Sequence, residues 1–162
     1  MNNKVTICSH SFIEWQLTEL RDVGTIPRRF YELIFQISRF LFYEACRGLK
    51  SQTTMVSTPT GESIVGHTMP VEKIIVVPVM RAGIHMADAA IECIPGVQIC
   101  HLGMERDEHP PFRARTYYEK RPMDAKNLQC FVVDPMIATG GSSRDALSQV
   151  KRWGVENISL IG

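Results

Sequence analysis

Residues 130–143, CFVVDPMIATGGSS, decide how the rest of the chain is interpreted. Phe131–Val133 is an apolar, β-branched run, which indicates a strand buried on both faces, and it ends at an acid followed by a proline. Residues 139–142, TGGS, then supply small side chains, two glycines able to adopt positive φ, and hydroxyl groups that can cap a helix. The stretch therefore predicts a strand, a turn and a helix in succession.

The turn in this unit is suited to holding a phosphate group. Backbone N–H groups of a glycine turn, with a helix N-terminus behind them, can face one anion together. The carboxylate of Asp134 precedes the turn and can accept hydrogen bonds from sugar hydroxyls. A phosphorylated sugar is thus the ligand class that these residues favour, while an ordinary structural connection is the competing interpretation. No Gly-Lys-Ser/Thr occurs here, so the turn is not a P-loop.

The composition limits the possible classes of protein. With 162 residues, 44% hydrophobic and 22% charged, we expect a single domain over 1–162. A formal net charge of +1 gives no broad basic field, so we expect no nucleic-acid partner. Five cysteines without a Cys-x-x-Cys pair predict reduced thiols, and no apolar run is long enough to span a membrane. We therefore expect a cytoplasmic protein with no membrane partner.

Strands and helices alternate on both sides of the opening stretch. Ile74–Met80 is another doubly buried strand, Val97–Met104 a third, and Ile158–Ile161 a final one. Between them, helices are predicted from Ile84 to Pro95-Gly96 and from Ser143 to Trp153. The apolar stripe of the first of these helices is expected to be Ile84, Ala87, Ile91 and Ile94. The fold class is therefore α/β, with a mostly parallel central sheet flanked by helices.

The N-terminal part and one later segment do not follow this alternation. Residues 1–50 are expected to be helical, with a helix capped by Thr25 that carries Pro27 in its first turn and ends near Gly48. Residues 55–69 predict a hairpin that turns near Gly61. Residues 105–124 are rich in charge and proline, and we expect them to form an exposed arm or flap.

Three charged residues follow the ends of predicted strands. Arg81, Arg106 and Asp134 each come where such a strand stops, and ligands of parallel sheets bind at that edge. An arginine grips phosphate oxygens in bidentate fashion, so two arginines beside the phosphate turn imply a second anionic group. Surface ion pairing is the competing interpretation for each arginine.

Several motifs resemble the uracil phosphoribosyltransferases, in the same order and at similar spacing. They are VVDPMIATGGS ending at Ser142, VPVMRAG ending at Gly83, and GMERD from Gly103 followed by a Tyr-Tyr-x-Lys at Tyr117. The N-terminal LTELRD from Leu17 is similar as well, so the resemblance runs from about Cys8 onward. It implies a type I phosphoribosyltransferase fold with N-terminal helices and a protruding arm.

The resemblance also implies an activity and a site. The family transfers phosphoribose from phosphoribosyl pyrophosphate (PRPP) to uracil, giving UMP and pyrophosphate in pyrimidine salvage. By this resemblance, ribose and 5'-phosphate contact Asp134, Pro135, Met136, Ile137, Ala138, Thr139, Gly140, Gly141 and Ser142, while Arg81 and Arg106 hold the pyrophosphate. The catalytic set is Asp134, Arg81 and Arg106. Mg²⁺ is expected to bind mainly through the substrate pyrophosphate, with no metal site made by the protein alone, and family members usually associate as homo-oligomers.

Some features depart from the family pattern. The family's uracil-recognising Gly-Asp-Ala-Gly-Asp motif lies beyond the position of Gly162 and does not occur in this sequence. A PRPP-binding module without transferase activity, or a regulatory subunit, is therefore the alternative function, and another nucleotide-binding α/β protein is a third. His85 and Ala89 stand where the family usually has glycines, and the imidazole of His85 either crowds the pyrophosphate loop or has a structural role.

Overall fold

The computed structural model of the chain describes residues 5–106 and 114–162. Its helices and strands, in chain order, are α1 (Ser11–Arg21), α2 (Pro27–Ala45), β1 (Gln52–Ser57), β2 (Ser63–Thr68), β3 (Ile74–Met80), α3 (Ile84–Cys93), β4 (Gln98–Ile99), β5 (Leu102–Arg106), β6 (Ala114–Glu119), β7 (Gln129–Val133), α4 (Gly141–Arg152) and β8 (Asn157–Ile161). Short 3-10 helices, η1 (Cys46–Gly48) and η2 (Val71–Lys73), flank the β1–β2 hairpin. No helix in these described ranges is long and apolar enough to cross a membrane.

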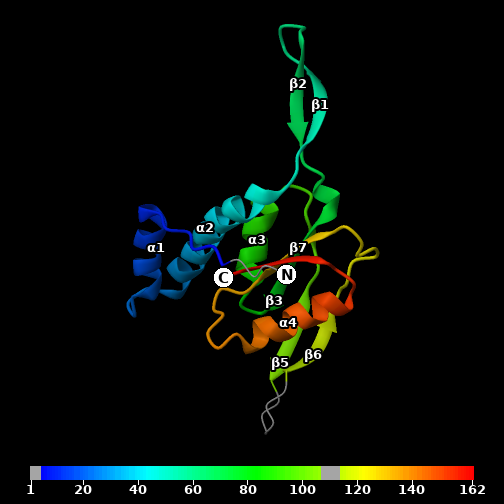
Figure 1. The fold of residues 1–162 in the computed structure, drawn as a ribbon. Helices are drawn as coiled ribbons and strands as arrows, with labels where there is room; N and C mark the ends of the chain where they lie inside the picture. Colours follow the sequence, from blue (N-terminus) through cyan, green and yellow to red (C-terminus); the bar gives the residue numbers. More distant parts are fainter. Residues whose placement is uncertain (1–4, 107–113) are drawn as a thin grey trace.

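The central sheet is mostly parallel, as the sequence predicts. Its strand order is β6-β5-β3-β7-β8, and the short β4 also pairs with β3. All of these neighbours are parallel except β6, which runs antiparallel to β5 at the edge. Helices cover both faces, with α2 and α3 on one and α4 on the other (Figure 1). The α/β class is confirmed.

Two apolar cores enclose the sheet because its central strands are buried on both faces. In β3, Ile74 and Val76 face the α2–α3 core, while Ile75 and Val77 face the α4 core. In β7 the same alternation places Phe131 in the first core and its neighbours in the second. Continuous apolar runs are thus required at both positions, since each residue meets one layer of helices or the other.

The helices differ from the expectation in two details. Thr25 does not cap α2, whose N-cap is Ile26 and has no side-chain cap. The hydroxyl of Thr25 donates instead to the Glu19 carbonyl at 2.5 Å, which satisfies an acceptor at the end of α1. The buried face of α3 matches the predicted stripe only in part, since Ala87 and Ile94 are buried whereas Ile84 and Ile91 are exposed. Its buried residues are Met86, Ala87, Ala89 and Ala90. Small side chains let α3 lie close to α2 and the sheet, which a search for large apolar residues misses.

The hairpin of β1 and β2 projects away from the rest of the molecule (Figure 1). The strands pair antiparallel, and the turn includes Gly61 at φ 86°, as predicted. All residues of β1 are exposed, and those of β2 are exposed apart from Gly66. The hairpin therefore receives little support from the domain that carries it.

The expected arm at 105–124 contains regular structure that the sequence did not reveal. β6 extends the sheet beyond β5, with a register shift between Gly103 and Met104. The predicted third strand is likewise divided into β4 and β5, with Cys100 and His101 between them. The part of the arm at 107–113, including Arg113, lies outside the described residues.

Candidate active site

The carboxyl ends of three neighbouring strands form the edge at which the predicted site residues meet. β3 lies between β5 and β7 in the sheet. The parallel register pairs Pro78 of β3 with Val133 of β7, so Arg81 and Asp134 both follow their strands at this edge. β5 pairs with β3 through Met80 and ends at Arg106. The backbone positions of all three charged residues therefore lie at one edge of the sheet.

Gly83 holds the turn after β3 against the end of β7. The turn begins with a cis peptide bond between Met80 and Arg81, and the Gly83 amide donates to the Val79 carbonyl at 2.9 Å. A Cβ atom at Gly83 would lie 2.5 Å from the Val133 carbonyl oxygen and 2.8 Å from the Val79 nitrogen. Only glycine permits this approach, which brings the Arg81 turn next to the residue that precedes Asp134.

Asp134 is a buried carboxylate whose orientation is fixed by two hydrogen bonds. Only 6% of the residue is exposed. Its Oδ1 accepts from the Met136 amide at 3.4 Å, and its Oδ2 accepts from the Ser143 hydroxyl at 3.2 Å. Its own amide donates to the Ile161 carbonyl of β8 at 3.1 Å. Ser143 was not among the predicted site residues; its place three positions after Gly140 in the helix N-terminus is the signal that could have identified it.

The turn after β7 leads directly into the N-terminus of α4. Gly140 is the N-cap of α4 at φ 76°, in the left-handed region, and no side chain caps the helix. Its amide donates to the Ile137 carbonyl at 2.7 Å. The second positive φ belongs to Ala138, at 46°, and not to Gly141, which already lies in α4. The uncapped first turn of α4 thus leaves its N-terminus open to an anion.

The exposure of the other predicted residues matches a surface that ligands can reach. Arg81 is exposed, and so are Met136, Ile137, Ala138 and Thr139, whereas Pro135, Gly140, Gly141 and Ser142 are half-buried. For Arg106 the structure describes the backbone, and its side chain lies outside the described part. The structure thus brings together the turns at Arg81 and at residues 134–142.

His85 has contacts that indicate a structural role. Its ring lies 4.4 Å from the ring of Tyr31 on α2, measured between centroids, and its Nδ1 is 3.8 Å from an Asp88 carboxylate oxygen. These contacts tie the start of α3 to α2. Ala89 is fully buried on the same helix, so neither departure from the family pattern blocks the loop at Arg81.

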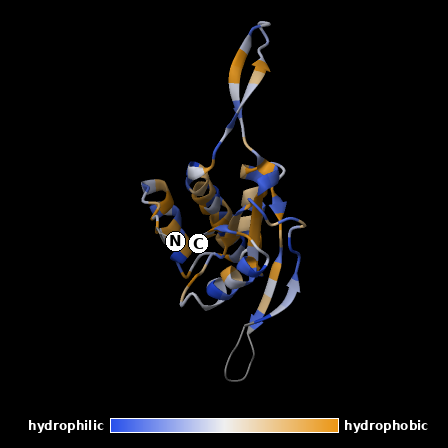
Figure 2. Cartoon of the chain, turned by 45° about the vertical axis from the view of Figure 1, so that its right-hand side comes forward, coloured by the Kyte–Doolittle hydropathy of each residue, from blue (hydrophilic) through white to orange (hydrophobic). Residues whose placement is uncertain are grey.

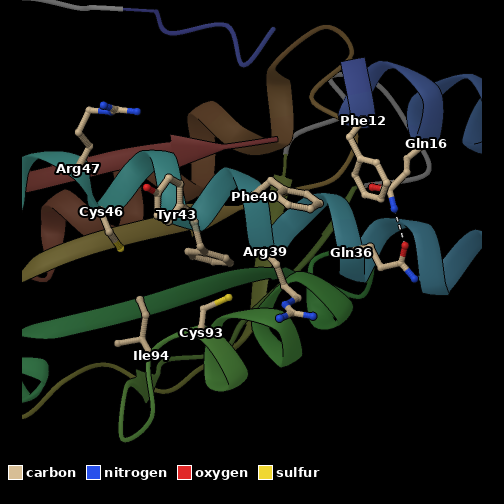
Figure 3. Close-up of a pocket in the computed structure, with 11 residues that line it drawn as sticks. Phe12, Gln16, Gln36, Arg39, Phe40, Tyr43, Cys46, Arg47, Cys93 and Ile94 are labelled. Atoms are coloured by element: carbon tan, nitrogen blue, oxygen red, sulfur yellow. Dashed lines mark hydrogen bonds between the residues drawn. The ribbon is translucent and has the colours of Figure 1, made fainter. Parts of the chain in front are cut away.

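The largest pocket described lies elsewhere in the molecule. It has a volume of about 900 Å³ and is lined by residues of α1 and α2, including Phe12 and Tyr43, together with Cys93 and Ile94 at the end of α3 (Figure 3). Neither Arg81 nor Asp134 lines it. Within residues 5–106 and 114–162, no group of three or more His, Cys, Asp or Glu side chains could hold a metal ion.

Solved structures place this fold among the phosphoribosyltransferases. The chain superimposes on the AQ2163 protein from Aquifex aeolicus with a TM-score of 0.88, covering 97% of this chain and 74% of that one at 24% identity. A hypoxanthine phosphoribosyltransferase from Staphylococcus aureus matches with a TM-score of 0.54, covering 81% of this chain and 62% of that one at 9% identity. The fold class is that of the type I phosphoribosyltransferases.

Sequence comparison narrows the class to one family. The family model described as uracil phosphoribosyltransferase matches residues 7–162. The uracil phosphoribosyltransferase of Roseiflexus sp. (strain RS-1) is 39% identical over 159 residues, which cover 98% of this chain and 75% of the relative. That of Dictyoglomus thermophilum is 36% identical over 157 residues, covering 97% and 75%. The chain belongs to the uracil phosphoribosyltransferase family.

Proposed function

We propose that the chain transfers the phosphoribosyl group of PRPP to uracil, giving UMP and pyrophosphate. One observation supports this most directly: Gly83 allows the Arg81 turn to lie against the end of β7. The exposed Arg81, the buried carboxylate of Asp134 and the uncapped N-terminus of α4 therefore lie at one edge of the sheet. PRPP carries two anionic ends separated by a ribose. An edge with two anion-binding turns on either side of a carboxylate is complementary to that ligand.

Each part of the edge has a role in this proposal. The 5'-phosphate lies on the turn from Thr139 to Ser142, at the N-terminus of α4. The ribose hydroxyls donate to Asp134, which Ser143 holds in position. The backbone between the Asp134 carboxylate and this turn consists of Pro135, Met136, Ile137 and Ala138. Arg81 and Arg106 bind the pyrophosphate, which a guanidinium can grip in bidentate fashion.

The reaction breaks one bond and forms one at the anomeric carbon. The bond from this carbon to the pyrophosphate oxygen breaks, and its electron pair leaves with pyrophosphate. A ring nitrogen of uracil supplies the electron pair of the new bond, and its proton passes to water. Positive charge develops on the sugar and negative charge on the leaving group, so Arg81 and Arg106 stabilise departure while Asp134 favours the cationic ribose electrostatically. No covalent nucleophile on the protein is required.

Mg²⁺ fits this site only when it is bound to the phosphate groups of the substrate. Asp134 is the buried carboxylate at the edge, and both of its oxygens accept hydrogen bonds from the protein. Mg²⁺ prefers octahedral oxygen ligands and commonly binds through substrate phosphates with one or two carboxylates. We therefore propose that PRPP brings the ion to the site, where it neutralises charge on the pyrophosphate.

Calorimetric titration of PRPP with Mg²⁺ tests the site assignment. Asp134→Asn and Arg81→Ala are each expected to weaken binding by at least about tenfold, because each removes one charged contact, on the order of 1.5–3 kcal/mol. Arg28→Ala is the control, since Arg28 is an exposed arginine of α2 paired with Glu32. If both site variants bind PRPP with the affinity of the wild type, Asp134 and Arg81 do not form the PRPP site. A radiolabelled-uracil assay measures UMP formation in the same proteins.

Three further properties belong to the same proposal. We propose that residues 1–162 act as one phosphoribosyltransferase domain, with the helices of 1–50 and the arm at 105–124 as its parts. Copies of the chain associate with each other, at least as a dimer. The protein works in the cytoplasm, and the five cysteines, which the structure describes as free thiols, support that setting.

A further inference from the structure

The edge strand β6 pairs irregularly with β5 near the carboxyl end of that strand. On β5, Gly103 pairs with Tyr118. The next residue, Met104, pairs with Thr116, so Tyr117 is an extra residue in the ladder. Figure 2 shows β5 and β6 side by side at the edge of the molecule, with β6 mostly in the pale and blue colours of polar residues. A β-bulge of this kind changes the direction of the side chain that it carries, and bulges are frequent next to active sites.

Gly103 makes room for the ring of Tyr117. A Cβ atom at Gly103 would lie 2.6 Å from the Cε2 and Cζ atoms of Tyr117 and 3.0 Å from its hydroxyl oxygen. Any larger residue would push the phenol away, because these distances are shorter than a contact between carbon atoms allows. The outer end of the ring, with its hydroxyl group, therefore lies directly over the main chain of Gly103.

The phenol lies on the same side of the sheet as the Arg81 turn. Gly103 pairs with Met80, the residue that directly precedes Arg81. Leu102 packs in the core beneath α4, and successive strand residues point to opposite faces, so Gly103 faces the side of α3. The Arg81 turn leads into α3 on that side. The Tyr117 hydroxyl group is therefore beside the turn that we propose to bind pyrophosphate.

The hydroxyl group of Tyr117 is accessible to a ligand. The residue is 53% exposed. Among the residues that the structure describes, none forms a hydrogen bond with this hydroxyl group. A phenol O–H is a hydrogen-bond donor, and its bonds to charged oxygens are stronger than those to neutral ones. Packing thus holds the ring in place while its donor has no partner within the described part of the chain.

We propose that Tyr117 is a further substrate-binding residue, whose hydroxyl group donates a hydrogen bond to the pyrophosphate group of PRPP. The inference rests on the proposed function, in which Arg81 binds the same group. Negative charge on the pyrophosphate grows as its bond to the ribose breaks, and a donor that is already in position stabilises this charge without reorganisation. Tyr117 thus acts together with Arg81 on the leaving group.

Calorimetric titration with inorganic pyrophosphate and Mg²⁺ tests the contact. Tyr117→Phe keeps the ring over Gly103 and removes only the hydroxyl group, so pyrophosphate and PRPP are each expected to bind about tenfold more weakly. Ribose 5-phosphate is expected to bind as it does to the wild type, because it meets only the Asp134 side of the site. Tyr43→Phe is the matched control, since Tyr43 is an exposed tyrosine that lines the pocket away from the site.

A double-mutant cycle with Gly103→Ala tests whether the contribution of the hydroxyl group depends on the place of the ring. The added methyl group displaces the phenol, so Tyr117→Phe is expected to have little further effect on pyrophosphate binding in the Gly103→Ala protein. A full tenfold effect in that protein would contradict the proposed geometry. Thermal unfolding checks that each variant is folded, and if Gly103→Ala is not, the titration of Tyr117→Phe decides alone.

The outcomes separate this inference from the proposed function. Wild-type affinity for pyrophosphate in Tyr117→Phe overturns the inference and leaves the function standing, because Asp134→Asn and Arg81→Ala test that function independently. An equal loss of affinity for ribose 5-phosphate also overturns the inference, since the whole edge of the sheet would then be disturbed. A wild-type protein that binds neither PRPP nor pyrophosphate overturns both.

Discussion

At the scale of single residues, Gly83 is the position on which the geometry of the site depends most. Its hydrogen atom occupies the space between the Val133 carbonyl and the backbone of β3. Both neighbours are main-chain atoms of central strands, which cannot move without disturbing the sheet. A methyl group at this position must therefore displace the Arg81 turn.

Gly83→Ala is expected to lower the free energy of unfolding by about 1–3 kcal/mol, the usual cost of overpacking, and to weaken PRPP binding. Thermal unfolding and titration measure the two effects. Gly48→Ala is the control, because a Cβ atom there meets nothing within 4 Å. Equal melting temperatures for wild type and Gly83→Ala would show that the turn does not depend on this contact.

Ser143→Ala tests how Asp134 is held. The hydroxyl is buried and donates to Oδ2 of Asp134, so its loss leaves a buried carboxylate oxygen with one donor fewer. We expect a destabilisation of about 1–3 kcal/mol and weaker PRPP binding. Ser148→Ala is the comparison, since that exposed hydroxyl bonds only to a helix carbonyl. If chemical denaturation and titration both leave Ser143→Ala level with Ser148→Ala, Ser143 does not position the carboxylate.

At the scale of elements, one carboxylate joins β6, which also pairs with β5, to helix α4. Glu119 Oε2 accepts from Gln149 Nε2 at 2.6 Å and from Trp153 Nε1 at 3.2 Å, which joins the end of β6 to α4. The same helix begins at the turn that we propose to hold the 5'-phosphate. The outer edge of the sheet and the turn are therefore connected through a single helix.

Glu119→Gln is expected to loosen β6 with only a small change in global stability, below about 1 kcal/mol, because the contact is exposed. Hydrogen exchange of the β6 amides should become faster while that of β3 stays the same. Glu156→Gln provides an exposed control. Unchanged exchange in β6 would mean that the β5 ladder alone holds the strand.

The elements also show how far the sequence predicts this fold. β3 and β7 were predicted because their continuous apolar runs can only be buried on both faces. β6 was missed because ARTYYE at an edge lacks both the apolar run and clear alternation. The buried face of α3 was predicted only in part, because Ala89 and Ala90 are buried where Ile84 and Ile91 were expected. Of the candidate site, Asp134 and the turn were predicted from local pattern, whereas Ser143 required knowledge of which helix face turns inward.

At the scale of the whole molecule, the buried thiols make the free energy of unfolding depend on pH in the alkaline range. Burial raises the pKa of Cys130 far above the ordinary value of 9.0, and burial also raises the pKa of Cys100. The folded state then retains protons that the unfolded chain releases, so stability is full below pH 9 and falls as pH rises above it. The slope is about 1.4 kcal/mol per pH unit for each such thiol.

Urea denaturation at several values of pH between 7.5 and 10.5 should show the free energy of unfolding falling as the pH rises. In Cys130→Ala this fall with pH should be less steep. Cys93→Ala is the comparison, because burial raises the pKa of this exposed thiol as well, but less than that of Cys130. Thiol labelling of the native protein should modify Cys93 well before Cys100 or Cys130. Identical slopes for all three proteins would assign the alkaline loss to other groups.

The pairing of β3 with β7 also determines when the protein can acquire its site during folding. Ile74 pairs with Gln129, 55 positions later in the chain, and the whole α3–β6 region lies between them. Forming this ladder closes a long loop before any of its contacts are gained, which makes folding slow compared with that of local helices and hairpins. On a ribosome, the helices of residues 11–45 and the first hairpin emerge and can form well before β7 is made. The Arg81 turn meets Asp134 only after that late closure, so the ability to bind substrate should appear in the last kinetic phase of refolding.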